Sequence, residues 1–337
     1  MAKHSGKLVV SLDFEIMWGV RDIVTVHDYG EHLRGVHQAL PKLLEYFKKY
    51  HLRGTFATVG LLFFENKDEL LQHLPAVKPK YTDPNLSPYG EYLIKNVGLN
   101  NDDDPYHFAP QLIKLIKNTP HQEIGTHTFS HFYCQEDGQT ITDFKHDLKA
   151  ALAIAKSRGI DKLTSIVFPR NQVNHDYFKV CKELGIIAYR GNEDSWIYTV
   201  RSIDNKNLFR RSFKLIDAYV NISGHHCYAD EYLQSGALIN IPSSRFLRPY
   251  SKSLRFFEAL RLNRIKESMT YAAKNSLLYH LWWHPHNFGI NQNENFSFLE
   301  KVLQHYAYLN KKYDFTSYTM SEVAEMLIKK TTRLIEK

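Results

Sequence analysis

Cysteine is scarce in this chain: only Cys134, Cys181 and Cys227 occur among 337 residues. No two of them have the spacing of a CxxC pair, so the sequence supports neither a disulfide framework nor a cysteine-based zinc module, and a reducing compartment fits best. A long apolar run is also missing. The strand-like stretch after "MAKHSG" has about half a dozen residues, fewer than a signal peptide or a membrane span requires. We therefore expect a cytoplasmic protein.

Repeats, low-complexity tracts and Gly/Ser or Pro linkers are absent as well, which predicts one domain over residues 1–337. The hydrophobic fraction of 43% and the charged fraction of 23% are typical of a globular chain and argue against disorder. Two stretches depart from the rest: residues 75–105 are rich in Pro, Asn and Asp, and residues 242–256 are basic and aromatic. We expect both to be insertions.

Acidic residues are in the minority, with 36 Asp and Glu against 43 Lys and Arg and a formal net charge of +7. This surplus favours an anionic partner such as a nucleotide-linked sugar or a phospholipid surface, although charge spread over a chain also serves solubility alone. We do not expect nucleic acid as a partner, because no helix-turn-helix, RNP or zinc-finger pattern occurs. The sequence gives no indication of oligomeric state.

Strand-like and helix-like segments alternate along the chain, which is typical of an α/β fold with parallel strands. The expected strands are 7–12, 53–60, 122–127, 163–169, 185–190, 237–242 and 276–284, with 313–318 as an eighth candidate. Apolar residues recur every three or four positions in four intervening segments, 31–50, 106–118, 142–157 and 293–312. Seven or eight such units predict a (β/α) barrel rather than an open sheet.

Acidic residues close the first expected strand in "SLDFE". Asp13 and Glu15 are in phase on the strand, so both project to one side. Two carboxylates on one side repel each other, which is tolerated where a cation lies between them or where one is poised as a base. The alternative is that Asp13 caps a helix and Glu15 is solvent-exposed.

Two further signals follow other expected strands. In "THTFSH", His127 and His131 are four residues apart, as two ligands of one divalent ion can be, although with 18 histidines such a spacing also arises by chance. In "FPRNQ", Arg170 could orient a carboxylate through two hydrogen bonds, or could form a surface ion pair. Because the ends of parallel strands meet at one edge of a barrel, these groups are candidates for a single site.

The ordered set of these motifs, together with a late "LWWHPH", resembles the polysaccharide deacetylases of the NodB-homology group, carbohydrate esterase family four. The resemblance extends from residue 7 to about residue 320. It implies a distorted (β/α)7–8 barrel and a metal-dependent hydrolase that removes acetyl from an N-acetylated sugar.

The resemblance also implies roles for individual residues. Asp13 matches the general base of the family, and His127 and His131 match two metal ligands. Glu15 takes the place of the acidic metal ligand, although many members have adjacent aspartates where this chain has a one-residue gap and a glutamate. The implied metal is divalent, with zinc expected first and cobalt or nickel as alternatives.

Three more residues are assigned in the same way. Arg170 resembles the arginine that holds the base, although the proline of its motif precedes it here instead of following it. His284 resembles the histidine that protonates the leaving amine, with His286 and His280 as rivals. Trp196, in "EDSW", resembles the aromatic residue beside that histidine and is a candidate substrate-binding residue.

The substrate class stays open at this point. Arg245 and Arg248 either line the substrate cleft, where they would meet a phosphate or carboxylate, or form solvated surface. One hypothesis is a deacetylase of a cell-surface polysaccharide precursor, nucleotide-linked or lipid-linked, with peripheral membrane contact. A second, favoured by Glu15, is hydrolysis of another C–N bond such as a ureide or cyclic amide. A third is a non-catalytic glycan-binding protein.

Overall fold

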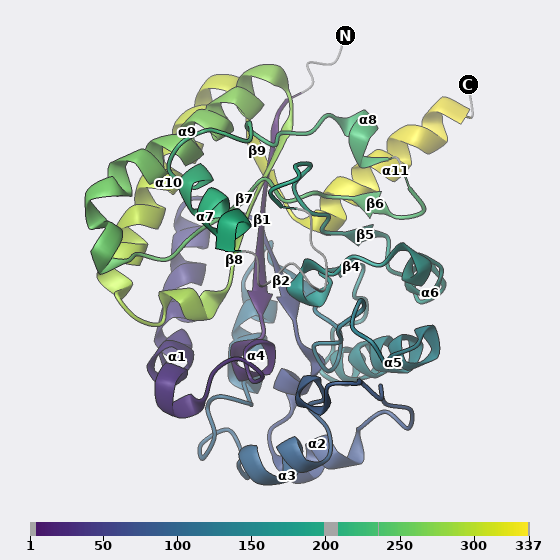
Figure 1. The fold of residues 1–337 in the computed structure, drawn as a ribbon. Coiled ribbons are helices and arrows are strands. Elements are labelled where there is room, and N and C mark those ends of the chain that lie inside the picture. The colour runs from purple at the N-terminus through teal and green to yellow at the C-terminus, as the bar shows by residue number, and fades with distance from the viewer. Residues whose placement is uncertain (1–4, 199–207, 235, 336–337) are drawn as a thin grey trace.

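The computed structural model describes residues 5–198, 208–234 and 236–335, in which nine parallel strands form one sheet (Figure 1). Their order is β6-β5-β4-β3-β2-β1-β8-β7, and β9 also pairs with β1. The strands are β1 (Lys7–Phe14), β2 (Gly54–Thr58), β3 (Glu123–Thr126), β4 (Ser165–Ile166), β5 (Ala188–Tyr189), β6 (Ile239–Asn240), β7 (Arg245–Phe246), β8 (Leu278–Trp283) and β9 (Thr316–Tyr318). Every expected strand segment contains one of them, which confirms the predicted α/β class.

The two edges of the sheet are joined by one extended segment. β6 pairs with β5 at one edge and β7 pairs with β8 at the other, yet only four residues separate β6 from β7 in the chain. Between them, Ser243 donates its backbone N–H to Gly191 O (2.9 Å) and the next residue, Ser244, donates to His280 O (2.8 Å). The sheet therefore curls into the distorted barrel that the sequence predicted. Residues 242–256, expected as an insertion, begin as part of this barrel wall.

Helices cover the outside of the sheet (Figure 1). They are α1 (Val26–Lys49), α2 (Lys67–Gln72), α3 (Glu91–Asn96), α4 (Pro110–Asn118), α5 (Ile141–Ser157), α6 (Phe178–Glu183), α7 (Leu208–Asp217), α8 (Asp230–Leu233), α9 (Glu258–Asn275), α10 (Gln292–Tyr313) and α11 (Met320–Ile335). The four expected helices correspond to α1, α4, α5 and α10. α9 was not predicted from the sequence, because its buried face includes Arg261, Arg264 and Ser268, which break the apolar periodicity.

The apolar core lies between the sheet and these helices. β1 is buried along its whole length, as expected for a strand covered on both faces. α1 buries Leu33, Val36, Leu40 and Leu43, which are three or four residues apart and so lie on one face. With β1 rigidly enclosed, the residues at its carboxyl end have a fixed position.

The predicted 75–105 excursion packs against the carboxyl end of β1. Arg21, which follows the strand, donates from Nη1 to Asn85 O (2.8 Å), and Tyr81 accepts the N–H of Tyr133 at its hydroxyl (2.9 Å). Asp104 is buried and accepts the backbone N–H of Gly98 (2.8 Å), which makes it a structural cap. The excursion therefore supports one side of the site.

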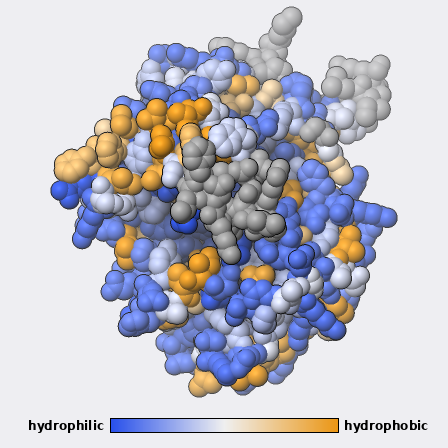
Figure 2. All heavy atoms as spheres, viewed as in Figure 1, coloured by the Kyte–Doolittle hydropathy of each residue, from blue (hydrophilic) through white to orange (hydrophobic). Residues whose placement is uncertain are grey.

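Exposed apolar side chains gather at the upper left of Figure 2, over α7 and α9. We call this group the apolar rim; its members are Ile216, Val220, Phe256, Phe257 and Leu260. The rings of Tyr219 and Phe257 lie 6.1 Å apart, which joins the segment after α7 to the start of α9. Among the helices of the described ranges, none has the length and apolar character to cross a bilayer.

Candidate active site

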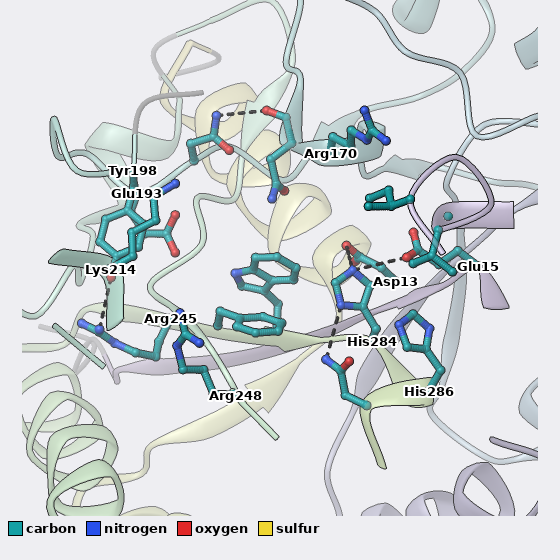
Figure 3. Close-up of a pocket in the computed structure, with 18 of the residues that line it drawn as sticks. Asp13, Glu15, Arg170, Glu193, Tyr198, Lys214, Arg245, Arg248, His284 and His286 are labelled. Carbon is teal, nitrogen blue, oxygen red and sulfur yellow. Dashed lines mark hydrogen bonds and ion pairs between the residues drawn. The ribbon is translucent and has the colours of Figure 1, made fainter. Parts of the chain in front are cut away.

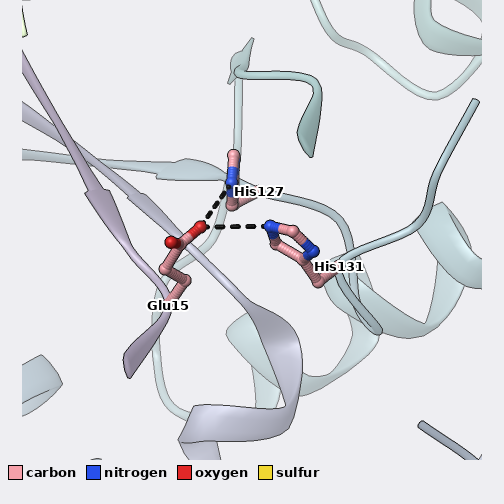
Figure 4. Close-up of side chains that lie close together, drawn as sticks. All are labelled: Glu15, His127 and His131. Carbon is pink, nitrogen blue, oxygen red and sulfur yellow. Dashed lines mark hydrogen bonds and ion pairs between the residues drawn. The ribbon is translucent and has the colours of Figure 1, made fainter. Parts of the chain in front are cut away.

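The predicted acidic and histidine ligands meet at the carboxyl ends of β1 and β3. Asp13 is the penultimate residue of β1, and Glu15 follows the strand directly. His127 follows β3, and His131 lies in the turn after it. Although more than 110 residues separate them in the chain, Glu15 Oε2 lies 3.2 Å from His127 Nε2 and 3.1 Å from His131 Nε2 (Figure 4). All three side chains are buried.

A buried carboxylate holds the histidine turn in shape. Thr128 and His131 have φ values of 64° and 59°, which β-branched and bulky residues adopt infrequently. Asp147, from α5, accepts the backbone N–H groups of Phe129 (2.7 Å) and Ser130 (3.2 Å), and also the Ser130 hydroxyl. Burial raises the pKa of Asp147 to about 6 in spite of these hydrogen bonds, which lower it. Asp147 was not predicted as a residue of the site, because no local sequence pattern marks it.

The hydrogen bonds of His127 and His131 indicate that a cation fits between them and Glu15. His127 Nδ1 lies 2.8 Å from Val167 O, and since a carbonyl only accepts, Nδ1 carries the proton of the neutral ring. Its Nε2 lone pair then faces the Glu15 carboxylate. Burial lowers the pKa of His131 to about 4, against the opposing influence of Glu15, so this ring is neutral at pH 7. A divalent ion would replace this repulsion between lone pairs with coordination by one carboxylate and two imidazoles.

A second candidate set shares Glu15. Its carboxylate, His284 and His286 also offer ligand atoms that lie within 4.8 Å of one another. His286 is buried, and burial lowers its pKa to about 3. The sets differ in exposure: the His284 side chain is 23% exposed, whereas His127 and His131 are buried, although His131 also borders the pocket. The enclosed set is the better match to a metal site, because it leaves His284 free to face a ligand.

Asp13 is held by Arg190. Both contacts of the Arg190 guanidinium with the Asp13 carboxylate measure 2.7 Å, and the same guanidinium reaches Asn171 Oδ1 (2.8 Å) and Ser11 Oγ (3.0 Å). Arg190 also lies 4.1 Å from the centroid of the Trp282 ring. Burial raises the pKa of Asp13, but the charge and hydrogen bonds of Arg190 help to bring it below its ordinary value. Asp13 is therefore a buried, ionised carboxylate with a fixed orientation.

The expectation for Arg170 is corrected by this geometry. Arg170 pairs with Asp22 and lies over the Tyr133 ring, 4.4 Å from its centroid, and its ion pair is not with Asp13. Its backbone has a φ of 54°, in a turn after β4. Arg190 instead ends the β5 segment and extends across the barrel interior. The same signal, an arginine at the end of an expected strand, was present in "GIIAYR".

His284 follows β8 and faces both carboxylates. Its Nε2 lies 3.4 Å from Glu15 Oε1 and 3.8 Å from Asp13 Oδ2. Its Nδ1 lies 3.4 Å from the Asn287 side-chain amide nitrogen, which can only donate, so the proton of the neutral ring is on Nε2. The rival His280 is fully buried and contacts Ser11 Oγ (2.8 Å) inside the barrel. His280 therefore does not take the place of His284.

These groups line one side of a pocket of about 830 Å³ (Figure 3). Figure 3 shows Asp13, Glu15 and His284 together, and Arg245 and Arg248 across the pocket from them. Two aromatic side chains next to His284 also line the pocket: the Phe246 and Trp282 rings are 5.8 Å and 5.6 Å from the His284 ring.

The prediction for Trp196 does not match this arrangement. Its side chain is 55% exposed and packs against the Phe213 ring, with centroids 5.8 Å apart. It is not among the described residues that line the pocket. Trp282, two residues before His284 in "LWWH", is the tryptophan beside that histidine. Arg245 and Arg248 line the pocket, and their role in substrate binding stays a prediction.

Comparison with known proteins agrees with this architecture. The model of the family described as Polysaccharide deacetylase matches residues 19–189, just over half of the chain. The matched range contains His127 and His131, while Asp13 and Glu15 precede it and His284 follows it. No protein of curated function matches the chain in sequence.

Solved structures show the same fold at low sequence identity. A protein described as a polysaccharide deacetylase from Mycobacterium smegmatis superposes with a TM-score of 0.61 at 14% identity, over 98% of this chain and 93% of that one. Another so described, from Pseudomonas aeruginosa PAO1, gives 0.54 at 10% identity, over 95% and 89%. The allantoinase Puue gives 0.55 at 9% identity, over 96% and 90%.

Proposed function

Because this chain belongs to the polysaccharide deacetylase family, a family of carbohydrate deacetylases, we propose that it is a metal-dependent hydrolase that removes acetyl from an N-acetylated sugar. One observation carries the proposal: Glu15, His127 and His131 converge beside an ionised Asp13, and Asp13, Glu15 and His131 line a single pocket. Zinc is the first candidate for the ion, since one carboxylate and two imidazoles form a common catalytic zinc set. Cobalt and nickel are alternatives.

The ion would polarise the acetyl carbonyl and would lower the pKa of a nearby water. Asp13 accepts the proton of the attacking water, because each of its oxygens keeps a lone pair beyond the one that Arg190 occupies. Arg190 is a positioning residue that fixes the direction of those lone pairs. The Nε2 proton of His284 points toward the Asp13 and Glu15 carboxylates. His284 donates this proton to the departing nitrogen, which is otherwise a very poor leaving group.

The sugar ring lies on the aromatic surface of Phe246 and Trp282, beside His284. A pocket of about 830 Å³ is at the large end of the range for drug-sized ligands, which is more room than a single sugar needs. We place the sugar on a phosphate-linked carrier, as in a cytoplasmic precursor of a cell-surface polysaccharide.

The proposal is tested by metal content and acetate release. We expect one equivalent of divalent metal in the purified parent, its loss in His127→Ala, and its retention in His175→Ala, an exposed histidine outside the pocket. We expect acetate from N-acetylated sugars with the parent and a loss of about 10²–10⁴-fold in Asp13→Asn. Stoichiometric metal without acetate release would point to another C–N bond, such as a ureide. No metal and unchanged sugar binding in Asp13→Asn would point to a glycan-binding protein.

A further inference from the structure

We propose that the far end of the pocket is a phosphate-binding subsite in which Arg248, together with Arg211 and Lys214, binds a diphosphate group that carries the sugar. This inference rests on the proposed function and names its substrate class. The three cations line the same pocket as the carboxylates of the site, and Figure 3 shows Arg248 and Lys214 on the other side of it from Glu15. They come from β7's continuation and from α7, so two separate elements place positive charge at one end.

Within the part of the chain that the structure describes, the Arg248 side chain has no acidic partner. No hydrogen bond or ion pair of its side chain occurs within the described ranges, although it lines the pocket and is only partly exposed. Burial lowers the pKa of Arg248, while the phenols of Tyr219 and Tyr198 raise it and the neighbouring arginines lower it further. A partly desolvated guanidinium with cationic neighbours is stabilised by an anion from outside the chain.

The neighbouring Arg245 shows the opposite arrangement. It is 3% exposed and is paired with Asp217, at 2.7 Å from Nη1 to Oδ2. Asp217 is shared: Arg264 Nη2 is 3.6 Å from its other oxygen, so one carboxylate serves two arginines. Arg261 is matched by Glu258 at 2.5 Å. The four arginines at this end are Arg245, Arg248, Arg261 and Arg264. Only two carboxylates, those of Asp217 and Glu258, are paired with them, so a net positive charge remains.

Glu193 also lines this end of the pocket, and it can offset at most one of the positive charges. Burial raises its pKa, while hydrogen bonds and the arginines only partly oppose the rise. Lys214 and Arg211 add further positive charge from α7, and Lys214 lies 5.7 Å from the Tyr198 ring centroid. Among the described residues, five arginines at this end, counting Arg211, exceed the three carboxyl groups of Asp217, Glu258 and Glu193, so a diphosphate is a better complement than a single carboxylate.

The position of the subsite fits a sugar bound at the metal end. Phe246 lies between Arg245 and Arg248 in sequence, and its ring is next to His284. A sugar stacked on Phe246 and Trp282 therefore has the metal ligands on one side and the cations on the other. A single ligand that reaches both the metal ligands and the cations would therefore have its negative charge on the group attached to the sugar.

Two carriers share this diphosphate chemistry, a nucleoside and a polyprenyl lipid. The apolar rim borders this end of the pocket, since Ala218 lines it and Tyr219 contacts Phe257. A lipid chain would lie on that surface, whereas a nucleoside would gain little from it. Titrating the protein with inorganic pyrophosphate measures binding of the diphosphate alone. Titrations with uridine diphosphate and farnesyl diphosphate then show whether a nucleoside or a lipid carrier adds affinity.

The test measures pyrophosphate binding by calorimetry on the metal-loaded protein. We expect Arg248→Met to weaken binding about ten- to hundredfold, as expected when a charged hydrogen-bonding group is lost, and Arg248→Lys to weaken it less. The matched control is Arg255→Met, because Arg255 is exposed and lies over its neighbour Phe256. His127→Ala should leave pyrophosphate binding unchanged. Equal affinity in the parent and Arg248→Met, or loss of binding in His127→Ala, would overturn the subsite.

Acetate release separates this inference from the proposed function. The Arg248→Met variant should raise KM for a diphosphate-linked N-acetylhexosamine about ten- to hundredfold, whereas the control Arg255→Met should leave this KM unchanged. If no N-acetylated sugar releases acetate, the proposed deacetylase function is refuted, but the calorimetric test of the phosphate subsite remains valid. Acetate release with binding that is insensitive to Arg248 would refute the subsite alone.

Discussion

Replacing Arg190 by methionine should damage both the stability of the protein and the function of Asp13. The change removes two 2.7 Å contacts with the Asp13 carboxylate and keeps a side chain of similar length inside the barrel. Because Arg190 and Asp13 are 1% and 3% exposed, the carboxylate would be left buried without its cation. Removing one member of a buried pair costs about 3–5 kcal/mol of unfolding free energy.

Arg170→Met is the matched control, because the sequence pattern gave this arginine the same role. Its pair with Asp22 is partly exposed, at 20% and 7% for the two side chains, and contributes about 0–1 kcal/mol. Its position over the Tyr133 ring adds about 0.5–1 kcal/mol. The two arginine variants should therefore differ by at least about 1–2 kcal/mol in urea unfolding.

A double-mutant cycle with Asp13→Asn decides the point. Arg190→Met and Asp13→Asn should be non-additive by about 2–3 kcal/mol, whereas Arg170→Met and Asp13→Asn should be additive within about 0.5 kcal/mol. In activity, Arg190→Met should lower kcat about a hundredfold by misplacing the base. Additivity for the Arg190 cycle, or coupling of that size between Arg170 and Asp13, would refute the assignment of Arg190.

Three other perturbations test separate parts of the site. Asp147→Asn should weaken metal binding about 10–100-fold in a chelator competition, since it loosens the histidine turn, and metal affinity equal to the parent's would contradict this role. Trp282→Ala should raise KM for the sugar about three- to tenfold, while Trp196→Ala leaves this KM unchanged. The reverse ranking in steady-state kinetics would support Trp196 as the substrate-binding tryptophan. The Asp217 carboxyl has a pKa below its ordinary value, because Arg245 and its hydrogen bonds outweigh burial, so its contribution to stability is present above about pH 4 and is lost as the pH falls. The difference in unfolding free energy between the parent and Asp217→Asn should therefore shrink below about pH 4, and a difference that grows on acidification would contradict the sign.

The sequence predicted the elements whose pattern is local and missed those whose pattern depends on tertiary contacts. β1 and β8 are long buried runs, and α1 and α10 have clear apolar faces, so all four were visible. β7 has only two residues, one of them a buried arginine, and exists only because β8 pairs with it. No periodicity marks such a strand.

The candidate site divides in the same way. Spacing placed Asp13 and Glu15 on one side of a strand, and the position of His127 and His131 at the end of another expected strand, more than 110 residues away, made them candidates for the same site. The family resemblance then assigned the metal-ligand roles. The arginine that holds Asp13 was misassigned because both candidates end strands, and the sequence does not say which one extends across the barrel. That depends on strand order, which places β5 where Arg190 reaches β1.

Charge pairing inside the pocket connects the metal proposal with the phosphate proposal. Asp13 and Asp217 are each matched by a buried arginine, and neither has charge left for a ligand. Glu15 is buried with only imidazole partners among the described residues, and Arg248 has no acidic partner there. Since unpaired buried charges are costly, a cation at Glu15 and an anion at Arg248 are what the folded chain lacks at the two ends of one pocket. A single substrate that carries a diphosphate and an N-acetyl group would supply the anion at Arg248. Its uncharged amide would then lie beside the cation at Glu15.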